Sequence, residues 1–242
     1  MKVAYIFHGH SRTWKECHQS FFDNVFSVAP GDIYIHTWDR VNSKYGSFWN
    51  QTFGQLDEER EAISSKTLDL DGIIKTYKPK QIMVETDLGL ETPFRDYPQL
   101  KNLVSATPAH FAAYNMFKSQ YLSFNMAKSR EKYDKYFACR MDLEFTSKLD
   151  IVELNEEDVM MAPPTFTDFD DPKVDMLFDI YAIAPEHIME MKANFYHNIW
   201  KYWYSTDNLF SYFVEHAITK YYRDNGLRAK PSSLNFEIRR LF

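Results

Sequence analysis

Short apolar runs alternate along the chain with segments whose apolar residues recur at helical spacing. Runs of strand length and aromatic or β-branched content predict buried strands over residues 2–7, 32–39, 81–85 and 136–139. Helical periodicity predicts helices over residues 14–28, 67–77 and 110–128. Strands that alternate with helices are typical of an α/β fold, with a mostly parallel sheet flanked by helices.

The second part of the chain continues this pattern with shorter elements. A helix cap and a strand are predicted over residues 154–161, a strand over 176–183, and helices over 186–193 and 207–224. No internal repeat, low-complexity tract or flexible linker interrupts the sequence. A single domain over residues 1–242 is therefore predicted.

Polar residues follow the first two predicted strands where each strand ends. His8-Gly-His-Ser-Arg-Thr13 follows the first strand, and the second strand ends in His36-Thr-Trp-Asp39. A strand, helix and strand in this order predict a right-handed unit with parallel neighbouring strands. Both polar ends are then expected at one edge of the sheet, where a glycine-containing loop can offer backbone N–H groups to a ligand.

Acidic residues follow the apolar run at 136–139. Arg140, Asp142 and Glu144 alternate with apolar residues, so an extended chain would place both carboxylates on one side. Two carboxylates at a strand end are costly unless a cation lies between them, and their hard oxygens suit Mn²⁺ or Mg²⁺. The alternative is that Asp142 pairs with Arg140 while Glu144 is only exposed.

Other polar residues have simpler interpretations. Asp69-Leu-Asp71 precedes a predicted helix, so it is expected to cap that helix and not to bind metal. The histidines at 8, 10 and 36 lack the fixed spacing of zinc ligands and are expected to form hydrogen bonds. Asp179, Glu215 and Asp39 are candidates for a general base, and for Glu215 a solvated helix carboxylate is the alternative.

Composition narrows the classes of function. The net charge is −6 with no basic run, which argues against a general nucleic-acid binder. The aromatic content of 17% suits either a thick core or stacking on sugar faces. The two cysteines suggest no disulfide framework, and no segment has the apolar length of a transmembrane span. A cytoplasmic protein is expected.

Three blocks of the sequence, in this order, resemble a known family. Val3-Ala-Tyr-Ile-Phe-His-Gly-His-Ser-Arg-Thr13, Asp32-Ile-Tyr-Ile-His-Thr-Trp-Asp39 and Tyr133-Asp-Lys-Tyr-Phe-Ala-Cys-Arg-Met-Asp-Leu-Glu-Phe145 are similar to blocks of nucleotide-sugar glycosyltransferases. These relatives are GT-A-fold enzymes that bacteria and large viruses encode for surface glycans. For a viral protein the resemblance implies the host cytoplasm.

The resemblance implies a GT-A-like, Rossmann-like fold and transfer of a sugar to a glycan or other hydroxyl acceptor. The donor would be a UDP-, GDP- or dTDP-sugar, bound by a nucleotide-binding half of about residues 1–145, with the acceptor side at about 146–242. By position, the resemblance places the nucleotide beside His8, Gly9, Ser11 and Arg12, and the phosphates beside Arg140. Asp39, at the end of the second predicted strand, is also expected to contact the nucleotide. The resemblance implies a metal at Asp142 and Glu144. Asp179 lies near a D-x-F/Y-x-I block of the family and Glu215 near a late acidic helix, and both are expected to be catalytic residues.

Glu144 departs from the usual Asp-x-Asp pattern of these enzymes, so coordination by both acids or by one stays open. A non-catalytic module that binds a glycan or a nucleotide-sugar on the same fold is the alternative function. A metal-dependent phosphohydrolase would share the acidic pair, but the sequence lacks a second carboxylate-and-histidine cluster with metal-ligand spacing.

Overall fold

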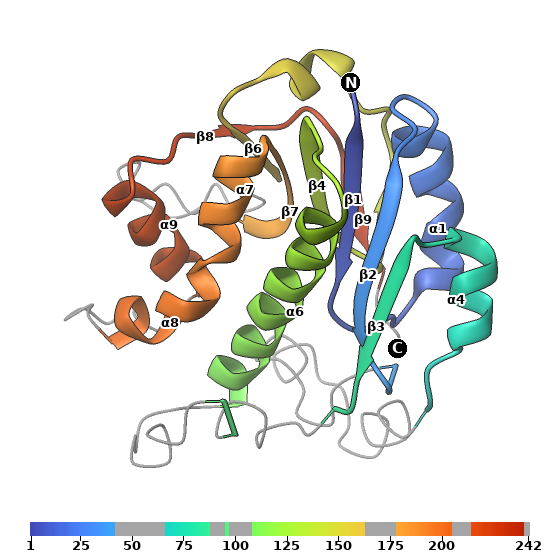
Figure 1. The fold of residues 1–242 in the computed structure, drawn as a ribbon, viewed down its shortest axis with the longest axis horizontal. Coiled ribbons are helices and arrows are strands. Elements are labelled where there is room, and N and C mark those ends of the chain that lie inside the picture. Colours follow the sequence, from blue (N-terminus) through green and yellow to red (C-terminus); the bar gives the residue numbers. More distant parts are fainter. Residues whose placement is uncertain (42–65, 88–94, 97–107, 163–177, 205–213, 240–242) are drawn as a thin grey trace.

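A seven-stranded mixed sheet forms the centre of the computed structural model (Figure 1). The structure describes residues 1–41, 66–87, 95–96, 108–162, 178–204 and 214–239. The strand order is β3-β2-β1-β4-β7-β6-β8. Their bounds are β1 Val3–His8, β2 Asp32–Trp38, β3 Gln81–Glu85, β4 Lys135–Arg140, β6 Val159–Ala162, β7 Phe178–Ala184 and β8 Ala229–Pro231. Of the described strands in this sheet, β7 alone runs antiparallel to its neighbours.

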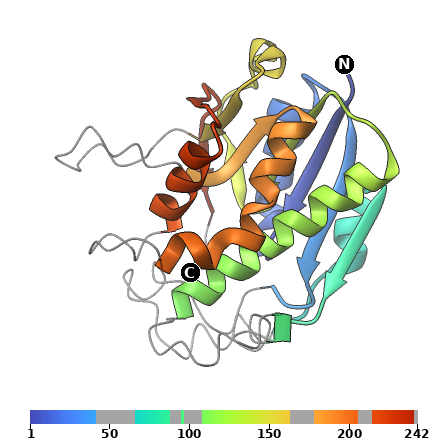
Figure 2. The ribbon, with the colours of Figure 1, turned by 60° about the vertical axis from the view of Figure 1, so that its left-hand side comes forward.

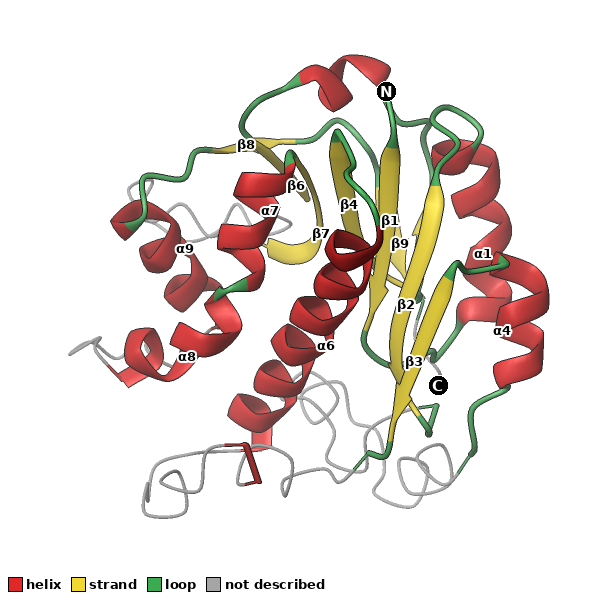
Figure 3. Ribbon diagram, viewed as in Figure 1, coloured by secondary structure: helices red, strands yellow, loops and turns green. Residues whose placement is uncertain are grey.

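Helices cover both faces of the sheet, which gives three layers (Figure 3). One face carries α6 (Pro108–Arg130), α7 (Glu186–Ala193), α8 (Phe195–Tyr204) and α9 (Val214–Asp224). The other carries α1 (Trp14–Phe21), the π-helical turn η1 (Phe22–Phe26) and α4 (Leu70–Tyr77). A small sheet of β5 (Leu143–Phe145) and β9 (Phe236–Ile238) lies on this second side, and the 3₁₀ turn η3 spans Ile151–Asn155.

The period of two in β1 divides the core between these faces. Ala4 and Ile6 belong to the cluster beneath α6, whereas Val3, Tyr5 and Phe7 belong to the cluster beneath α1. Both sets are buried, as expected for a central parallel strand covered on two sides. Figure 2 shows α6 and α7 lying side by side over the first of these faces.

The predicted parallel pairing of the first two strands is confirmed. β1 and β2 pair in parallel, with His8 opposite His36, so both polar strand ends lie at one edge. The turn before β2 requires a glycine for space: a Cβ on Gly31 would overlap the carbonyl oxygen of Val3 and lie 3.1 Å from Tyr5 Cε2. This close approach sets β2 against β1.

The predicted helix cap is also confirmed. The Asp69 carboxylate accepts a hydrogen bond from the Gly72 N–H at 3.0 Å, at the start of α4. The predicted helix over 14–28 is present as α1 followed by η1. Within the described residues, the last predicted helix begins at Val214, and residues 207–213 lie outside them. The short strands β8 and β9 were not predicted, because three residues carry too little periodicity.

The extended chain expected through the acidic pair is wrong in one respect. β4 ends at Arg140, and a turn at Met141 and Asp142 separates it from β5. β5 leaves the main sheet because it pairs with β9, placing Glu144 opposite Glu237. No helix in the described ranges is long and apolar enough to cross a membrane.

Candidate functional site

The strand order places a topological switch point between β1 and β4. From β1 the chain builds β2 and then β3 on one side, and it returns later to add β4 on the other side. The two strands are parallel, and their last residues, His8 and Arg140, are register partners. In open α/β sheets, ligands bind outside the carboxyl ends of the strands at such a point. His8 and Arg140 therefore mark the candidate site.

The loop after β1 has an unusual backbone at two positions. Gly9 has φ 90° and Arg12 has φ 26°, both in the region that side chains disfavour. The Gly9 N–H donates to Ser119 Oγ at 2.7 Å, which ties the loop to α6. The Arg12 N–H donates to the Val41 carbonyl at 3.1 Å. These contacts fix the backbone of the loop, from which the Arg12 side chain reaches Asp142 after the end of β4.

Asp142 is a buried carboxylate held by two arginines. Arg140 Nε donates to its Oδ1 at 2.8 Å, Arg140 Nη2 contacts Oδ2, and Arg12 Nη1 donates to Oδ2 at 3.2 Å. Burial opposes ionisation, but these two guanidiniums outweigh it and hold the pKa of Asp142 below its ordinary value. Two cations thus converge on one anion at the switch point.

Glu144 lies in a different environment. It forms an ion pair with Arg239, a residue that follows β9, and both side chains are partly exposed. Arg239 also donates its N–H to the Asp142 carbonyl at 2.9 Å, and its own carbonyl accepts from Thr13 Oγ1 at 2.8 Å. The segment that follows β9 therefore borders the site, and its Arg239 forms an ion pair with Glu144.

The two acids as arranged do not make a ready divalent-metal site. Both Asp142 oxygens accept from arginines, and Glu144 is paired with Arg239. Among the described residues, no group of three or more His, Cys, Asp or Glu side chains is placed to hold a metal ion. The arginine contacts follow the alternative expected from the sequence for Asp142, with Arg12 as a second partner.

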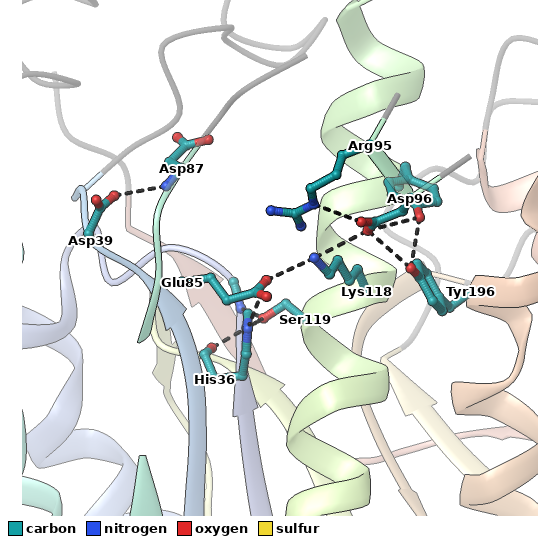
Figure 4. Close-up of polar contacts among 11 residues, drawn as sticks. His36, Asp39, Glu85, Asp87, Arg95, Asp96, Lys118, Ser119 and Tyr196 are labelled. Atoms are coloured by element: carbon teal, nitrogen blue, oxygen red, sulfur yellow. Dashed lines mark hydrogen bonds and ion pairs between the residues drawn. The ribbon is translucent and has the colours of Figure 1, made fainter. Parts of the chain in front are cut away.

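A buried polar network joins the ends of β1, β2 and β3 to α6 (Figure 4). Ser119 Oγ accepts from the Gly9 N–H and lies 2.7 Å from His36 Nδ1. His36 Nε2 lies 3.5 Å from Glu85 Oε2, which lies 2.9 Å from Lys118 Nζ. The contact with His36, together with Lys118, outweighs burial and lowers the pKa of Glu85 to about 2.

The order Glu85, His36, Ser119 has the connectivity of a nucleophilic triad, but it is a structural arrangement. Ser119 Oγ is fully buried and already accepts a backbone hydrogen bond from Gly9. A serine nucleophile needs a lone pair directed at its substrate, and this hydroxyl is already engaged by the Gly9 N–H, by His36 Nδ1 and by the His36 carbonyl. We therefore assign Ser119 to support of the β1 loop.

The network extends outward through Lys118 to Asp96. Lys118 Nζ lies 3.2 Å from Asp96 Oδ2, and Arg95 Nε lies 3.0 Å from Asp96 Oδ1. The hydroxyl of Tyr196 points to the same carboxylate (Figure 4), and the hydroxyl of Tyr114 does so as well. A short chain of opposite charges thus runs from the strand ends along the side of α6.

Asp39 follows β2 at this edge and serves the backbone. Its Oδ1 accepts from the Asp87 N–H at 2.9 Å (Figure 4), and its own N–H donates to the Glu85 carbonyl at 2.9 Å. Ser11 is fully buried in the β1 loop, and its Oγ has no hydrogen-bond partner among the described residues. The residues predicted to lie by the nucleotide therefore share one edge of the sheet.

Asp179 and Glu215 belong to different parts of the fold. Asp179 is the second residue of β7, and Tyr181 of that strand pairs with Cys139 near the end of β4. Because β7 is antiparallel to β4, it starts at the edge where β4 ends. Glu215 is the second residue of α9, which packs against α8. The topology thus brings Asp179 to the edge of the candidate site.

Sequence reasoning missed the partners that α6 and α7 supply. Lys118, Ser119, Gln120 and Lys192 are all buried and polar, and all four reach the ends of the strands or each other. A run of three polar residues between the apolar pairs at 116–117 and 121–122 was the available signal for the first three. No protein-family model and no curated protein matches the sequence of this chain.

Proposed function

We propose that the chain is a GT-A-like glycosyltransferase that moves a sugar from a nucleoside-diphosphate-sugar to a glycan or other hydroxyl acceptor. The observation that carries the proposal is the convergence of Arg12 and Arg140 at the switch point between β1 and β4. Nucleotides bind at this place in open α/β sheets, and guanidinium groups bind phosphate oxygens through paired N–H donors.

The chemistry of sugar transfer suits such a site. The bond between the sugar and the diphosphate breaks, and negative charge grows on the departing diphosphate. Fixed cations beside that group stabilise the charge without rearranging during the reaction. Asp142 orients both guanidiniums before a donor arrives, since it contacts Arg12 and Arg140 at once. Arg140 and Arg12 are the residues we place beside the diphosphate.

The acceptor hydroxyl needs a base. We propose Asp179 for this role over Glu215, because β7 begins at the edge where β4 ends. A carboxylate within reach of the hydroxyl removes its proton as the new glycosidic bond forms. For each transfer, the acceptor loses this proton and the donor releases a nucleoside diphosphate.

Mn²⁺ or Mg²⁺ remains part of the proposal without a step assigned to it. A divalent ion would act as a Lewis acid towards the diphosphate. Binding through Asp142 or Glu144 would require these acids to exchange their contacts with Arg140 and Arg239 for metal. The metal is therefore a separate arm of the test.

A thermal-shift screen across UDP-, GDP- and dTDP-sugars, each with Mn²⁺, with Mg²⁺ and with EDTA, tests the proposal. A donor at a hundred times its Kd stabilises the folded chain by about 2.7 kcal/mol, so the melting temperature rises. Arg140→Met should abolish the shift. Arg228→Met is the matched control, because Arg228 is exposed and precedes β8 at the opposite edge of the sheet. No shift with any donor contradicts the proposal.

A non-catalytic module for nucleotide-sugars or glycans on the same fold is the second candidate. The observation in its favour is that arginines already pair with Asp142 and Glu144, the two acids expected to hold the metal. Without that metal, the site could bind a diphosphate but would lack one aid to its departure. Donor hydrolysis followed by phosphorus NMR separates the two functions. Release of nucleoside diphosphate that Asp179→Asn abolishes supports the enzyme, whereas binding without any release supports the module.

A further inference from the structure

His8 is a buried imidazole at the switch point whose hydrogen bonds determine where its proton lies. It ends β1, lies opposite Arg140 in the register and has no exposed surface. Its side chain points to the face covered by α6, like Ala4 and Ile6 earlier in the strand. There it meets Gln120 of α6.

A buried lysine fixes the orientation of Gln120. Lys192 of α7 has no exposed surface, and its Nζ donates to Gln120 Oε1 at 2.8 Å. An ammonium group carries donors only, so the amide atom facing it must be the oxygen. The NH₂ group of Gln120 therefore points the other way, towards His8.

Gln120 in turn fixes the tautomer of His8. Gln120 Nε2 lies 3.3 Å from His8 Nε2. The amide nitrogen can only donate, so His8 Nε2 must accept and carries no proton. Burial, together with the nearby cations Lys192 and Arg140, lowers the pKa of His8 well below its ordinary value, so the ring is neutral. The single ring proton then resides on Nδ1.

The Nδ1–H of His8 is left without a use inside the described structure. Nδ1 is buried and has no hydrogen-bond partner among the described residues. A buried donor left unpaired is costly, and native structures rarely retain one without a reason. The position of this donor, at the strand edge where Arg12 and Arg140 converge, points to a ligand.

We propose that Lys192 and Gln120 hold His8 as its Nδ1–H tautomer, and that this N–H donates to an oxygen of the bound nucleoside diphosphate. Lys192 and Gln120 are positioning residues, and His8 is the residue that contacts the ligand. The identity of the ligand rests on the proposed function. The tautomer rests only on the contacts among the three side chains.

His36 supplies an internal comparison. His36 Nε2 faces the Glu85 carboxylate, which can only accept, so the ring proton of His36 is expected on Nε2. Ser119 Oγ, which accepts from the Gly9 N–H and lies 2.7 Å from His36 Nδ1 and 3.2 Å from the His36 carbonyl oxygen, then donates to Nδ1. Two histidines opposite each other in the β1–β2 register are thus expected to be opposite tautomers. One measurement on the full chain reads both.

The experiment is long-range ¹H–¹⁵N NMR of the histidine rings in the full chain, with signals assigned through His8→Gln and His36→Gln. A protonated Nδ1 on His8 and a protonated Nε2 on His36 are expected. Gln120→Glu keeps the shape but replaces the donor with a carboxylate that accepts from Lys192 and His8 alike. It should move the His8 proton to Nε2. Lys192→Met, which frees the amide to turn over, should give a mixture.

Binding of UDP, GDP and dTDP completes the test. Saturation of the parent with a nucleotide that binds should shift the His8 Nδ1 signal, and Gln120→Glu should weaken that nucleotide roughly tenfold. If the ring proton of His8 lies on Nε2 in the parent protein, the inference is overturned. A flipped tautomer in Gln120→Glu with unchanged affinity also overturns it, and leaves the proposed function standing. If no nucleotide binds the parent, the proposed function fails together with the ligand contact, and the tautomer is judged by the spectra alone.

Discussion

Arg140 Nε lies 2.8 Å from Asp142 Oδ1, so a cation at the end of β4 is held by a carboxylate two residues further along the chain. Arg12 reaches the same carboxylate from the loop after β1. Asp142 therefore links the two strands that meet at the switch point. Its removal should affect both stability and ligand binding.

Asp142→Asn should lower the free energy of unfolding by on the order of 3 kcal/mol, because it leaves two guanidiniums around an uncharged group. Urea unfolding measures this loss. Nucleotide affinity, measured with Mn²⁺ and with EDTA, gives the role of the acid. An equal loss in both conditions means that Asp142 orients the arginines, and a loss seen only with Mn²⁺ means that it binds metal.

Glu144→Gln should leave the urea midpoint nearly unchanged. The Glu144–Arg239 pair is partly exposed, and such pairs add little to stability. The same variant tests whether the second acid coordinates metal. If a Mn²⁺-dependent thermal shift in the parent is lost in this variant, Glu144 is a ligand, and if the shift persists, it is not. Glu237→Gln, on the strand partner of β5, is the control.

Mild acid should destabilise the fold through His8, which is buried, and His10, whose side chain is only 11% exposed. Burial, reinforced by Arg12, lowers the pKa of His10 to about 3, and the pKa of His8 lies well below its ordinary value of 6.5. Below about pH 6.5 the unfolded chain binds protons that the folded chain does not. Stability is therefore fully present above that pH and declines on acidification, by up to about 1.4 kcal/mol per pH unit for each histidine.

Urea unfolding between about pH 6 and pH 5 isolates this effect from the carboxylates, which titrate lower. His10→Gln should reduce the slope by about one proton. An unchanged slope in His10→Gln would mean that this ring is protonated in the folded state.

Ser119→Ala should cost about 2 kcal/mol, because the Gly9 N–H and His36 Nδ1 both lose their buried partner. Ser123→Ala is the matched control: this buried hydroxyl of α6 donates to the Gln120 carbonyl in its own helix. A loss as large in Ser123→Ala would show that any buried serine of α6 is equally sensitive. Stability is read from urea unfolding of both variants.

Two glycines should respond differently to alanine. Gly31→Ala inserts a methyl group against the Val3 carbonyl, so the free energy of unfolding should fall by about 1–3 kcal/mol. The nucleotide affinity of the folded protein should change little. Gly9→Ala meets no neighbouring atom within 4 Å but must adopt φ 90°, so the strain falls on the loop itself. Calorimetric titration with nucleotide should show the larger loss of affinity for Gly9→Ala.

Local sequence pattern was sufficient for the first four strands of the main sheet. The runs that became β1, β2, β3 and β4 are apolar and aromatic over strand length, and each is followed by polar residues. The turn at Met141 and Asp142 was missed because the alternation of apolar and polar residues over 140–145 is the same for one continuous strand as for two short strands joined by a turn. The partner that decides between them, β9, lies at the far end of the chain.

The candidate site was only partly visible in the sequence for the same reason. Asp142 and Arg140 are two residues apart, so their pairing could be named as an alternative. The contacts of Gly9 with Ser119 and of His8 with Gln120 join residues more than a hundred positions apart. No local period reports such contacts, since they depend on where α6 crosses the sheet.

The central position of β1 has a consequence for how the chain reaches its fold. β1 pairs with β4, and Lys2 beside it bonds Asp134, 132 residues away. During synthesis on the ribosome, β1, β2 and β3 emerge long before β4. Until β4 is made, the backbone N–H and C=O groups on one side of β1 have no strand to pair with. Contacts of such high sequence separation slow folding. Synthesis at low temperature or with a chaperone that shields strand edges should therefore raise the yield of native protein.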